Sequence, residues 1–576
     1  MLRLKSTLVM KHLITLLLIL FVTSGYAQVV TPGTGQSFTF QDFATGYPSA
    51  VIPTSAGHYT LLQNITISAG DTLLLDANTQ ELLFFNPITL TVHGQVTCAP
   101  RPDTLRITCN SANQYEIRLD NAASSRFSDI LFEYGSRILV MQSAATFERC
   151  EFRYFNNSCI QYSDASPVIE YCRFHQNRKA AISSAANMTG TPKIRHNTFY
   201  HNALDSVNQP QINLGPGFAS DTIVIEDNVI DGCVSTSGGI AIADFLGIGN
   251  THVIIRGNTV VNNRYGYTQQ GVRINALIED NIFRDNNLET NPMNGGSGVS
   301  IYGSDTTCRA KLRRNLITGN LWGLTAINKY GIDMGTAADH GNNCLFNNSN
   351  GGVEYNLYNN GTNSISAVGN FWGSNDSTYA ETVIFPSTSN VSYLPVMEIY
   401  PDILSFSLWD DASNEDAEFF PVGNDTLRYW VGCMHPDWSN VVPTIVLPMW
   451  VTCSPDPSEP QNFMPNPVTY TLTTVDGRSK EWVISVIWGG AVEDHVSLPV
   501  TVTPNPATSG RIVLYNDSED AVLVEVYTFT GQQVYAGRCT ESRMVVNTSS
   551  WRSGLYLLKA TQNRQSRAFK IVVNNF

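Results

Sequence analysis

Residues 194–202 read IRHNTFYHN, and close copies follow as IRGNTVVNN at 255–263, IEDNIFRDN at 278–286 and LRRNLITGN at 312–320. Each copy places one apolar residue three positions before a central Asn and another two positions after it. This central position, called the anchor here, is occupied by Cys150, Cys172, Asn197, Asn228, Asn258, Asn281, Asn315, Asn343 and Asn370. Intervals range from 22 residues, between Cys150 and Cys172, to 34, between Asn281 and Asn315. Such a period indicates a solenoid, in which each repeat buries its apolar face only by stacking on the next.

The apolar positions on either side of the anchor predict two internal ladders. The segments that carry them are short, rich in β-branched residues and interrupted by Gly and Asn, which is typical of strands. We expect each anchor Asn to adopt the left-handed conformation of a tight turn and to bond the Asn of the next coil. The ladders comprise Phe147, Ile169, Ile194, Ile225, Ile255, Ile278 and Leu312 before the anchor, and Phe152, Phe174, Phe199, Ile230, Val260, Phe283, Ile317, Leu345 and Trp372 after it.

Charged residues recur two positions before the anchor, where the side chain should point outward. The position holds Glu148, Glu170, Arg195, Glu226, Arg256, Glu279 and Arg313, so the sign alternates after the second coil. Coils stacked in register lie roughly 4.8 Å apart, so neighbours would pair, each exposed pair adding about 0.2 to 1 kcal/mol. The alternative, a track for a charged polymer, is weakened because alternating signs cancel the field that such a polymer needs.

The whole pattern resembles the repeat of the pectate-lyase-like superfamily, which implies a right-handed parallel β-helix. The phrase from Gly369 to Gly373, GNFWG, is similar to the one that often closes the last coil in such proteins. We interpret Trp372 as a plug of the core there rather than as a sugar-stacking residue. Residues 59–109 resemble opening coils, so the solenoid would hold on the order of eleven coils and span about 50 Å.

The length of 576 residues is enough for a long solenoid and two modules. Residues 1–27 have a basic start, an apolar run and a small-residue cleavage site, which indicates a secretory signal. We expect a linker or N-terminal cap at 28–58, the β-helix at 59–393, an immunoglobulin-like module at 394–495 and a last domain at 500–576. The predicted fold class is all-β: a right-handed parallel β-helix solenoid, an immunoglobulin-like β-sandwich module and a small C-terminal β-sandwich.

Charge and cysteine content restrict the partners. The formal net charge is -14, and it becomes more negative when the basic signal is removed, which argues against a nucleic-acid partner. A polyanionic glycan would need a local basic patch. No segment after the signal is long and apolar enough to span a membrane.

Eleven cysteines leave at least one unpaired within the chain, and adjacent anchors Cys150 and Cys172 predict a buried thiol stack. No Cys or His cluster has the spacing of a zinc site.

The composition changes at about Leu394, where Pro becomes frequent, and six of the nine Trp fall in the module that follows. This part resembles the immunoglobulin-like modules of surface proteins, and we interpret its Trp cluster as sandwich core rather than ligand contact. Cys433 and Cys453 flank a strand-like run and are the candidate disulfide. The resemblance rests on Asn466-Pro467-Val468, Asp476-Gly477 and Lys480-Glu481-Trp482.

The last domain, from Thr503 to Phe576, looks like the type IX secretion C-terminal sorting domain of Bacteroidota. That resemblance implies the type IX secretion machinery and its sortase as partners, translocation across the outer membrane, removal of the domain, and release or attachment at the cell surface. Structurally, its two matching glycines are simply turn residues. The matching positions are Pro504, Asn505, Pro506, Gly531, Gly554, Leu555, Tyr556, Lys570 and Val572.

The sequence holds no clear catalytic constellation. A pectin-type hydrolase needs clustered carboxylates, yet the Asn-Thr-Asp motif of that family is absent and the one Asp-Asp pair lies in the immunoglobulin-like module. A lyase needs a cation, or calcium, to neutralise the substrate carboxylate and a base to take the α-proton. The one set with suitable residue types, as candidates to neutralise and abstract, is Lys329, Tyr330, Asp333, Asp339 and His340. The other interpretation of this set is a solvated loop.

Three functions remain open. The favoured one is a non-catalytic surface protein whose β-helix binds glycans or other surface ligands, with no cofactor. The second is a polysaccharide lyase or glycoside hydrolase, in which calcium would be a cofactor only for a lyase. The third is a structural spacer, against which clustered aromatic residues on one exposed face would argue. Two long insertions, after Asn286 and after Asn320, are the loops in which function would lie.

Overall fold

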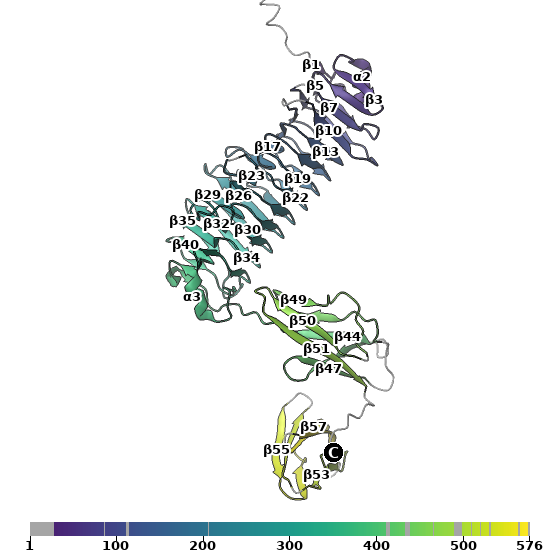
Figure 1. Ribbon diagram of the computed structural model, residues 1–576, viewed down its shortest axis with the longest axis vertical. Coiled ribbons are helices and arrows are strands. Elements are labelled where there is room, and N and C mark those ends of the chain that lie inside the picture. Colours follow the sequence, from purple (N-terminus) through teal and green to yellow (C-terminus); the bar gives the residue numbers. More distant parts are fainter. Residues whose placement is uncertain are drawn as a thin grey trace, which may run out of the picture. The chain divides into compact units, whose positions relative to one another are not determined.

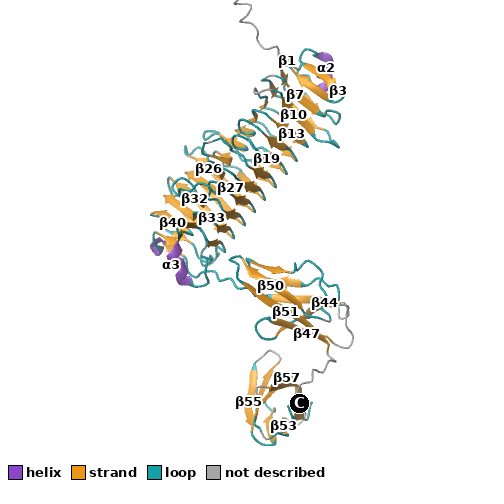
Figure 2. Ribbon diagram, in the orientation of Figure 1, coloured by secondary structure: helices purple, strands orange, loops and turns teal. Residues whose placement is uncertain are grey.

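The computed structural model describes residues 28–85, 87–110, 114–205, 207–410, 415–431, 438–464, 466–488, 498–507, 510–518, 520–528, 532–562 and 565–573. The predicted signal at residues 1–27 lies outside these ranges. Strands dominate the described chain, which separates into two compact units near residue 400 (Figures 1 and 2). The all-β fold class is therefore confirmed.

Three long sheets form the walls of the first unit, and within them nearly all neighbouring strands are parallel. Wall 1 contains β1 (Gln28–Val30), β5 (Asn64–Ile67), β8 (Thr89–Val92), β11 (Glu116–Asp120), β14 (Arg137–Met141), β17 (Ile160–Ser163), β20 (Ile182–Ser184), β23 (Gln209–Leu214), β26 (Ser237–Asp244), β29 (Tyr267–Gly271), β32 (Ser297–Gly303), β35 (Trp322–Asn328), β40 (Leu357–Gly361) and β42 (Ile384–Phe385).

Wall 2 contains β3 (Val51–Ser55), β4 (His58–Leu61), β7 (Glu81–Phe84), β10 (Leu105–Cys109), β13 (Ile130–Glu133), β16 (Glu151–Arg153), β19 (Arg173–His175), β22 (Thr198–Tyr200), β25 (Val229–Asp231), β28 (Thr259–Val261), β31 (Ile282–Arg284), β34 (Leu316–Thr318) and β37 (Cys344–Phe346). Wall 3 contains β12 (Ser125–Ser128), β15 (Ala145–Glu148), β18 (Val168–Glu170), β21 (Lys193–Arg195), β24 (Thr222–Glu226), β27 (Thr251–Arg256), β30 (Ile274–Glu279), β33 (Arg309–Arg313), β36 (Gly331–Asp333), β41 (Ile365–Ser366) and β43 (Val391–Ser392).

The two predicted apolar ladders lie in the core, one inside wall 3 and one inside wall 2. In wall 2, Phe152, Phe174 and Phe199 stack with ring centroids 4.6 and 4.9 Å apart. Trp372 is 1% exposed at the end of the same ladder, as the core-plug interpretation predicts. Each apolar ring therefore packs on its equivalent in the next coil, which is the burial that a solenoid needs.

The anchors form a buried hydrogen-bond ladder, but the turn geometry differs from expectation. Each Asn from Asn197 to Asn343 donates its side-chain amide to the anchor of the next coil. The left-handed conformation belongs instead to the residue before the anchor, because the anchor itself must point inward to reach its partners. These left-handed residues are Arg149, Tyr171, His196, Asp227, Gly257, Asp280, Arg314, Asn342 and Gly369.

Cys150 and Cys172 extend the same ladder as thiols. The backbone N–H of Cys150 donates to the Cys172 sulfur at 3.4 Å, and that of Cys172 donates to Asn197 Oδ1 at 2.8 Å. Burial raises the pKa of the Cys150 thiol. The thiol stack is confirmed, and it replaces the amide ladder over these two coils.

The outer charge ladder on wall 3 pairs as predicted over its middle coils. Arg256 Nη1 lies 3.2 Å from Glu226, and its Nη2 lies 2.6 Å from Glu279. The next member departs from the pattern: Arg313 is 3% exposed and binds Asp333 and Asp339, each at 2.9 Å. Arg314 takes its place by binding Glu279 at 2.9 Å.

The solenoid begins earlier than expected. β1 pairs in parallel with β5, and the short helix α2 (Phe40–Gly46) lies before β3 (Figure 1). A further small sheet joins β2 (Ser37–Phe38), β6 (Thr72–Leu75) and β9 (Gln95–Cys98). Wall 1 has 14 strands, more than the roughly eleven coils expected, and residues 28–58 contribute one of them, β1. At the other end lie β38 (Ser349–Asn350), β39 (Val353–Glu354), η1 (Ser377–Tyr379), α3 (Ala380–Val383) and η2 (Thr388–Asn390).

The second unit begins with a two-sheet module, as the sandwich expectation requires. One of its tryptophans, Trp438, is 1% exposed, whereas Trp409 is 50% exposed, so the Trp cluster is core only in part. Cys433 lies outside the described residues, so the Cys433–Cys453 disulfide stays a prediction. The sheets contain β44 (Ser405–Asp410), β45 (Glu415–Glu418) and β48 (Thr444–Val446), and β46 (Phe420–Pro421), β47 (Thr426–Val431), β51 (Ser479–Trp488), β50 (Val468–Thr474) and β49 (Val451–Ser454).

The C-terminal domain is a second, smaller pair of sheets. Asn505 holds the motif that opens it: its amide donates to Lys570 O at 2.6 Å, and its Oδ1 accepts from Val572 N at 2.9 Å. Gly531 lies outside the described residues. The sheets contain β52 (Val500–Thr503), β53 (Arg511–Asn516) and β56 (Arg543–Asn547), and β55 (Gln533–Cys539), β54 (Val522–Thr528), β57 (Gly554–Gln562) and β58 (Gln565–Val573).

Candidate functional site

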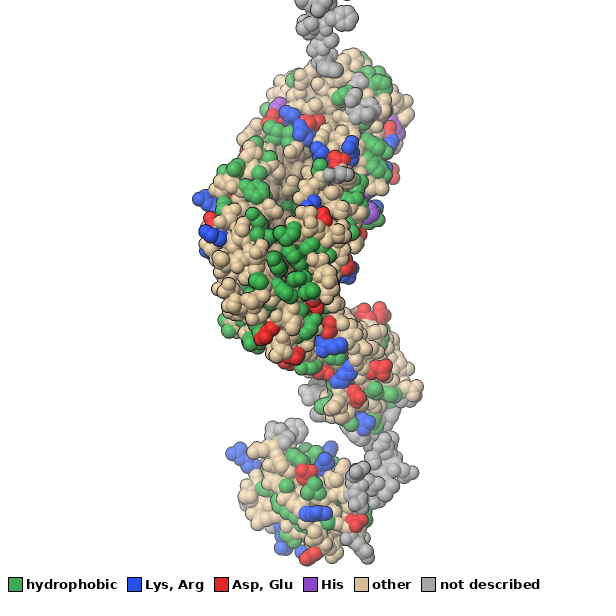
Figure 3. Space-filling view, turned by 60° about the vertical axis from the view of Figure 1, so that its left-hand side comes forward, with side chains coloured by type: hydrophobic (Ala, Val, Ile, Leu, Met, Phe, Trp, Pro, Cys, Tyr) green, Lys and Arg blue, Asp and Glu red, His purple; other side chains and the backbone are tan. Residues whose placement is uncertain are grey.

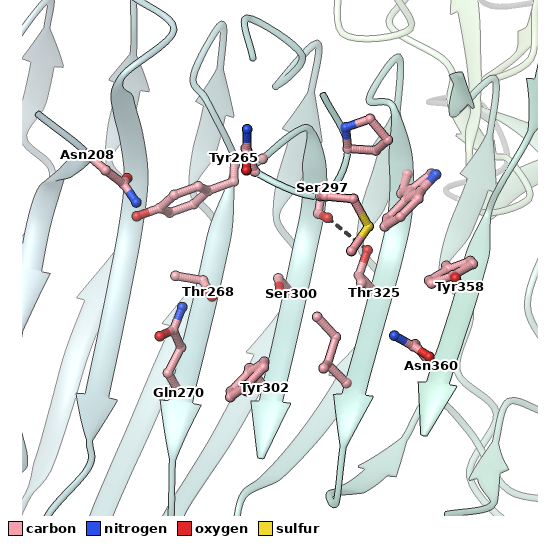
Figure 4. A pocket seen from close by; sticks show the side chains of 16 residues that line it. Asn208, Tyr265, Thr268, Gln270, Ser297, Ser300, Tyr302, Thr325, Tyr358 and Asn360 are labelled. Atoms are coloured by element: carbon pink, nitrogen blue, oxygen red, sulfur yellow. Dashed lines mark hydrogen bonds between the residues drawn. The ribbon is translucent and has the colours of Figure 1, made fainter. Parts of the chain in front are cut away.

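A cavity of about 240 Å³ lies on the outer face of wall 1, and we call it the wall-1 cleft. Strand alternation creates it, because successive residues of β29, β32, β35 and β40 point in turn into the core and out to solvent. The outward residues form two rows that follow the strand register (Figure 4). The first row is Thr268, Ser300, Thr325 and Tyr358, and the second is Gln270, Tyr302, Ile327 and Asn360.

One edge of the cleft is a loop that precedes β32. Its residues Pro292, Met293 and Asn294 line the cavity, and the Arg264 Nε–H holds the loop by donating to Asn294 O at 2.8 Å. At the end of the loop, Ser297 and Thr325 share a hydrogen bond of 2.8 Å, drawn as a dashed line in Figure 4. The loop is therefore fixed at both its middle and its end.

Aromatic rings gather at the other edge of the cleft. The rings of Trp322 and Tyr358 stack with centroids 4.3 Å apart and an interplanar angle of 17°. Tyr355 lies beside both and packs against Phe385 at 4.4 Å. Tyr302 is 38% exposed. Figure 3 shows a cluster of hydrophobic side chains over the middle of the solenoid, with charged ones mainly toward its margins.

The indole N–H of Trp322 is a donor without an acceptor. Trp322 is 7% exposed, and none of the described atoms accepts a hydrogen bond from its Nε1. A buried polar group left in this state costs about 1–3 kcal/mol unless water or a ligand satisfies it. Trp322 is also one of the residues that line the cleft.

The lining of the cleft carries no formal charge. All sixteen lining residues among the described part of the chain are uncharged, and they include amides, hydroxyls and aromatic rings. Burial raises the pKa of the Tyr265 hydroxyl, so this group stays a neutral hydrogen-bond donor. Such a surface can stack on apolar ring faces and bond hydroxyls, but it supplies neither the carboxylate pair of a glycosidase nor a cation for a carboxylated substrate.

The five residues predicted as a lyase set lie in three different environments: the core, an ion-pair cluster and the exposed surface. Tyr330 belongs to the core: it is 1% exposed, its hydroxyl donates to Asn359, and burial raises its pKa to about 12. Asp333 and Asp339 converge on Arg313. Lys329 and His340 are exposed. Asp333 and Asp339 are thus brought together because both form ion pairs with Arg313. The catalytic role of the whole set stays a prediction.

The sequence-based search missed the wall-1 residues, although a signal was present. The repeated phrase covers only the strands of walls 3 and 2, because the anchor lies between them. The segments SGVSIYG and WGLTAIN, assigned to insertions, are in fact strands β32 and β35. Their apolar residues alternate with Ser, Thr and Tyr, and this period of two indicates a half-exposed strand.

Comparisons with protein families support the solenoid and both modules. Residues 103–267 and 137–371 match the family described as right handed beta helix region. The solenoid is a right-handed β-helix. Behind this β-helix, residues 431–486 match the family described as SGBP, N-terminal, and residues 501–574 match the secretion system C-terminal sorting domain. The type IX sorting tail indicates secretion to the cell surface or the extracellular space.

Solved structures are similar to this chain at low identity. The periplasmic alginate epimerase AlgG is 11% identical, with 63% of this chain and 84% of that chain covered and a TM-score of 0.39. A mutant of AlgG is 12% identical, with 63% of this chain and 83% of that chain covered and a TM-score of 0.40. A putative glycoside hydrolase from Bacteroides thetaiotaomicron is 15% identical, with 29% of this chain and 81% of that chain covered and a TM-score of 0.15. At these values the likeness carries no argument about activity, and no curated protein matches the chain.

No helix among the described residues is long and apolar enough to cross a membrane.

Proposed function

We propose that this exported protein is a non-catalytic surface protein that binds a glycan in the wall-1 cleft. The observation that carries the proposal is an uncharged cavity lined by aromatic rings, hydroxyls and amides, among them Trp322, whose buried Nε1–H has no acceptor among the described residues. Sugars present apolar C–H faces that pack on such rings, and hydroxyls that accept and donate hydrogen bonds. The clustered rings also count against a purely structural spacer.

The match to the family described as SGBP, N-terminal supports a link to glycans independently of the cleft, because it falls on residues 431–486 of the second unit. The sorting domain supports exposure to extracellular polysaccharides. The cleft volume of about 240 Å³ is below the ~300–1,000 Å³ of pockets for drug-sized ligands. The cleft would therefore hold a short part of a longer chain that lies across the strands.

The test is titration calorimetry of the purified protein with neutral glucans, mannans, xylans and galactans. Tyr302→Ala removes an exposed ring of the cleft and should weaken binding about tenfold, the effect of roughly 1.4 kcal/mol. Trp322→Phe keeps a ring but removes the donor, so binding should weaken by about two- to tenfold. Tyr171→Ala is the matched control, since Tyr171 is 58% exposed on the same solenoid, precedes the anchor Cys172 and is not among the residues that line the cleft.

Unchanged affinity in both cleft variants, or no binding of any neutral glycan by the wild type, would contradict the proposal. The second function, cleavage by Lys329, Tyr330 and His340, is tested separately by release of new reducing ends with and without calcium. Cleavage that is lost in Lys329→Ala and His340→Ala would make the protein an enzyme. Release of no reducing ends from the same panel would agree with binding alone.

A further inference from the structure

A second concave surface lies on the outer face of wall 3. The register aligns Thr222, His252, Asn275, Arg309 and Gly331 across β24, β27, β30, β33 and β36. Three adjoining hollows of about 430, 360 and 360 Å³ follow this line. Asn275 lines all three, so they form one continuous groove. We call it the basic groove, after His252, Arg273, Arg309 and Lys311.

Two arginines of the basic groove have no ion-pair partner among the residues that the structure describes. Arg273 donates from Nη1 to Gly247 O at 3.0 Å, and Arg309 donates from Nε to Thr306 O at 3.3 Å. Both side chains are exposed. Elsewhere on the same wall, Arg195 and Arg256 each contact two glutamates. The groove therefore leaves positive charge uncompensated on a wall that otherwise pairs it.

The acidic residues near the groove already have partners of their own. Asp339 contacts Lys311 at 2.8 Å and Arg313 at 2.9 Å, and Asp333 also binds Arg313. Asp305 accepts hydrogen bonds from Thr307, which together with the nearby charge of Arg273 lower the pKa of Asp305. Asp221 pairs with Lys193. Asp333 is the single carboxylate in the lining of the three hollows as described. The local balance is positive in a chain whose net charge is -14.

The floor of the groove is apolar and its centre is an amide. Ile254 and Leu277 are half-buried on neighbouring strands and line one hollow together with Lys311. Asn275 is exposed between them and the arginines. Apolar side chains suit the C–H faces of sugar rings, an amide can bond hydroxyls, and guanidinium groups bind planar anions with paired hydrogen bonds.

From this combination we infer a second binding site, separate from the wall-1 cleft, for a polysaccharide that carries carboxylate or sulfate groups. The anionic groups bind Arg273 and Arg309, and the sugar rings lie over Ile254 and Leu277. This inference is independent of the proposed function, because the two sites lie on different walls and differ in charge. One protein would then contact a neutral glycan and an acidic one at once.

The test measures binding of the full purified protein to two matched pairs of polymers at low salt. Polygalacturonate is compared with its methyl ester, and dextran sulfate with dextran, with single-stranded DNA as a further anion. Arg273→Gln combined with Arg309→Gln should weaken binding to the better acidic polymer at least tenfold. Asn275→Asp places a carboxylate at the centre of the groove without changing its size and should have a similar effect. Asn156→Asp adds the same charge outside the groove and should change nothing.

Two further measurements keep the result interpretable. Unchanged melting temperatures show that the variants are folded, which substitutions at exposed positions and at the half-buried Asn156 should permit. Tyr302→Ala, which lies in the wall-1 cleft, should leave acidic binding intact, so failure of one site is distinguished from failure of the other. Equal binding by wild type and groove variants, a loss as large in Asn156→Asp, or DNA binding as tight as that of the best acidic polysaccharide would each overturn the inference.

Discussion

Asn258 shows how one side chain can connect three coils. Its Oδ1 accepts from the backbone N–H and the side-chain amide of Asn228, at 3.0 and 2.9 Å. Its Nδ2 donates to Ile225 O in the preceding coil at 2.9 Å and to Asn281 Oδ1 in the following coil at 3.0 Å. Asn258 is 1% exposed, so loss of its amide would leave the buried backbone N–H of Asn228 without its acceptor. The Asn228 amide would keep its bond to Ile194 O, and Asn281 Oδ1 would keep the backbone N–H of residue 258.

Asn258→Ala should therefore lower the free energy of unfolding by on the order of 3 kcal/mol, since buried donors and acceptors are left unsatisfied at about 1–3 kcal/mol each. The measurement is the urea midpoint of the purified protein, followed by circular dichroism. Asn275→Ala is the control: this Asn is exposed on the neighbouring β30, and its loss should stay within about 0.5 kcal/mol. Similar midpoints for the two variants would count against the ladder as a main source of stability.

Asp71 ties down the first coil through its carboxylate. Oδ2 accepts from Gly33 N at 2.7 Å, and Oδ1 accepts from the N–H groups of Thr34, Gly35 and Gln36 at 2.9 to 3.0 Å. Burial alone would raise the pKa of Asp71, but its hydrogen bonds outweigh burial and hold the pKa below the usual 3.8. The ionised form is thus favoured by folding.

Asp71→Asn should destabilise the N-terminal coils at neutral pH, because an amide N–H would face backbone N–H groups. The carboxylate contribution is complete above pH 3.8 and is lost as the pH falls through the lower folded-state pKa. The difference between wild type and variant should therefore shrink on acidification. Thermal unfolding at pH 7 and at successively lower pH checks this, and a pH-independent difference would contradict it.

The final strand of the sorting domain depends on a side chain as well as on its sheet neighbour. β58 pairs with β57 along one edge, while Asn505 bonds Lys570 O and Val572 N. The side chain of Asn505 thus acts in place of a short strand. This gives a physical reason for an Asn between the two prolines of the motif.

Asn505→Ala should speed hydrogen exchange in residues 565–573, because the amide of Val572 loses its acceptor. An average net hydrogen bond of about 1 kcal/mol corresponds to roughly fivefold faster local opening for each bond lost. Asn505→Asp is the matched comparison, since it keeps the acceptor for Val572 and loses only the donor to Lys570, so it should fall between wild type and Asn505→Ala. Mass spectrometry of peptic peptides provides the measurement, and three equal rates would refute the role.

Strands next to the anchor could be predicted from the sequence, and strands far from it could not. β27 and β28 lie on either side of Asn258 and are locked to it in register, so their apolar residues recur at fixed offsets. β29, β32 and β35 follow insertions of different lengths, so their offsets from the anchor vary. The wall-1 cleft lies on those strands, and for that reason spacing from the anchor does not find Trp322. Lys329 and His340 are found by residue type within a long insertion, and not by spacing.

Ion pairing is a second limit on prediction from spacing. Position alone places Arg313 in the outer charge ladder, yet Arg313 turns to the two aspartates of the following segment. The neighbouring Arg314 then completes the ladder with Glu279. A residue's offset in the repeat fixes its strand, but local carboxylates decide which of two adjacent arginines points outward.

At the scale of the whole molecule, the sorting domain determines where the protein is expected to go. Deletion of Thr503 to Phe576 should leave the protein in the periplasm, because the type IX sorting domain matched at residues 501–574 would be missing. Cell fractionation with an antibody against the β-helix measures the location. Normal surface display of the truncated chain would refute this, and display that depends on Asn505 alone would point to the motif rather than the whole domain.

The alternating charge ladder of wall 3 has a consequence for how such a chain can grow or shrink. Loss of a single coil would bring two like charges together, for example Glu226 beside Glu279 without Arg256 between them. Loss of two adjacent coils would leave every acid next to a base. Only the gain or loss of an even number of coils therefore keeps acidic and basic residues alternating on this wall. We expect viable insertions and deletions over these coils to comprise an even number of coils.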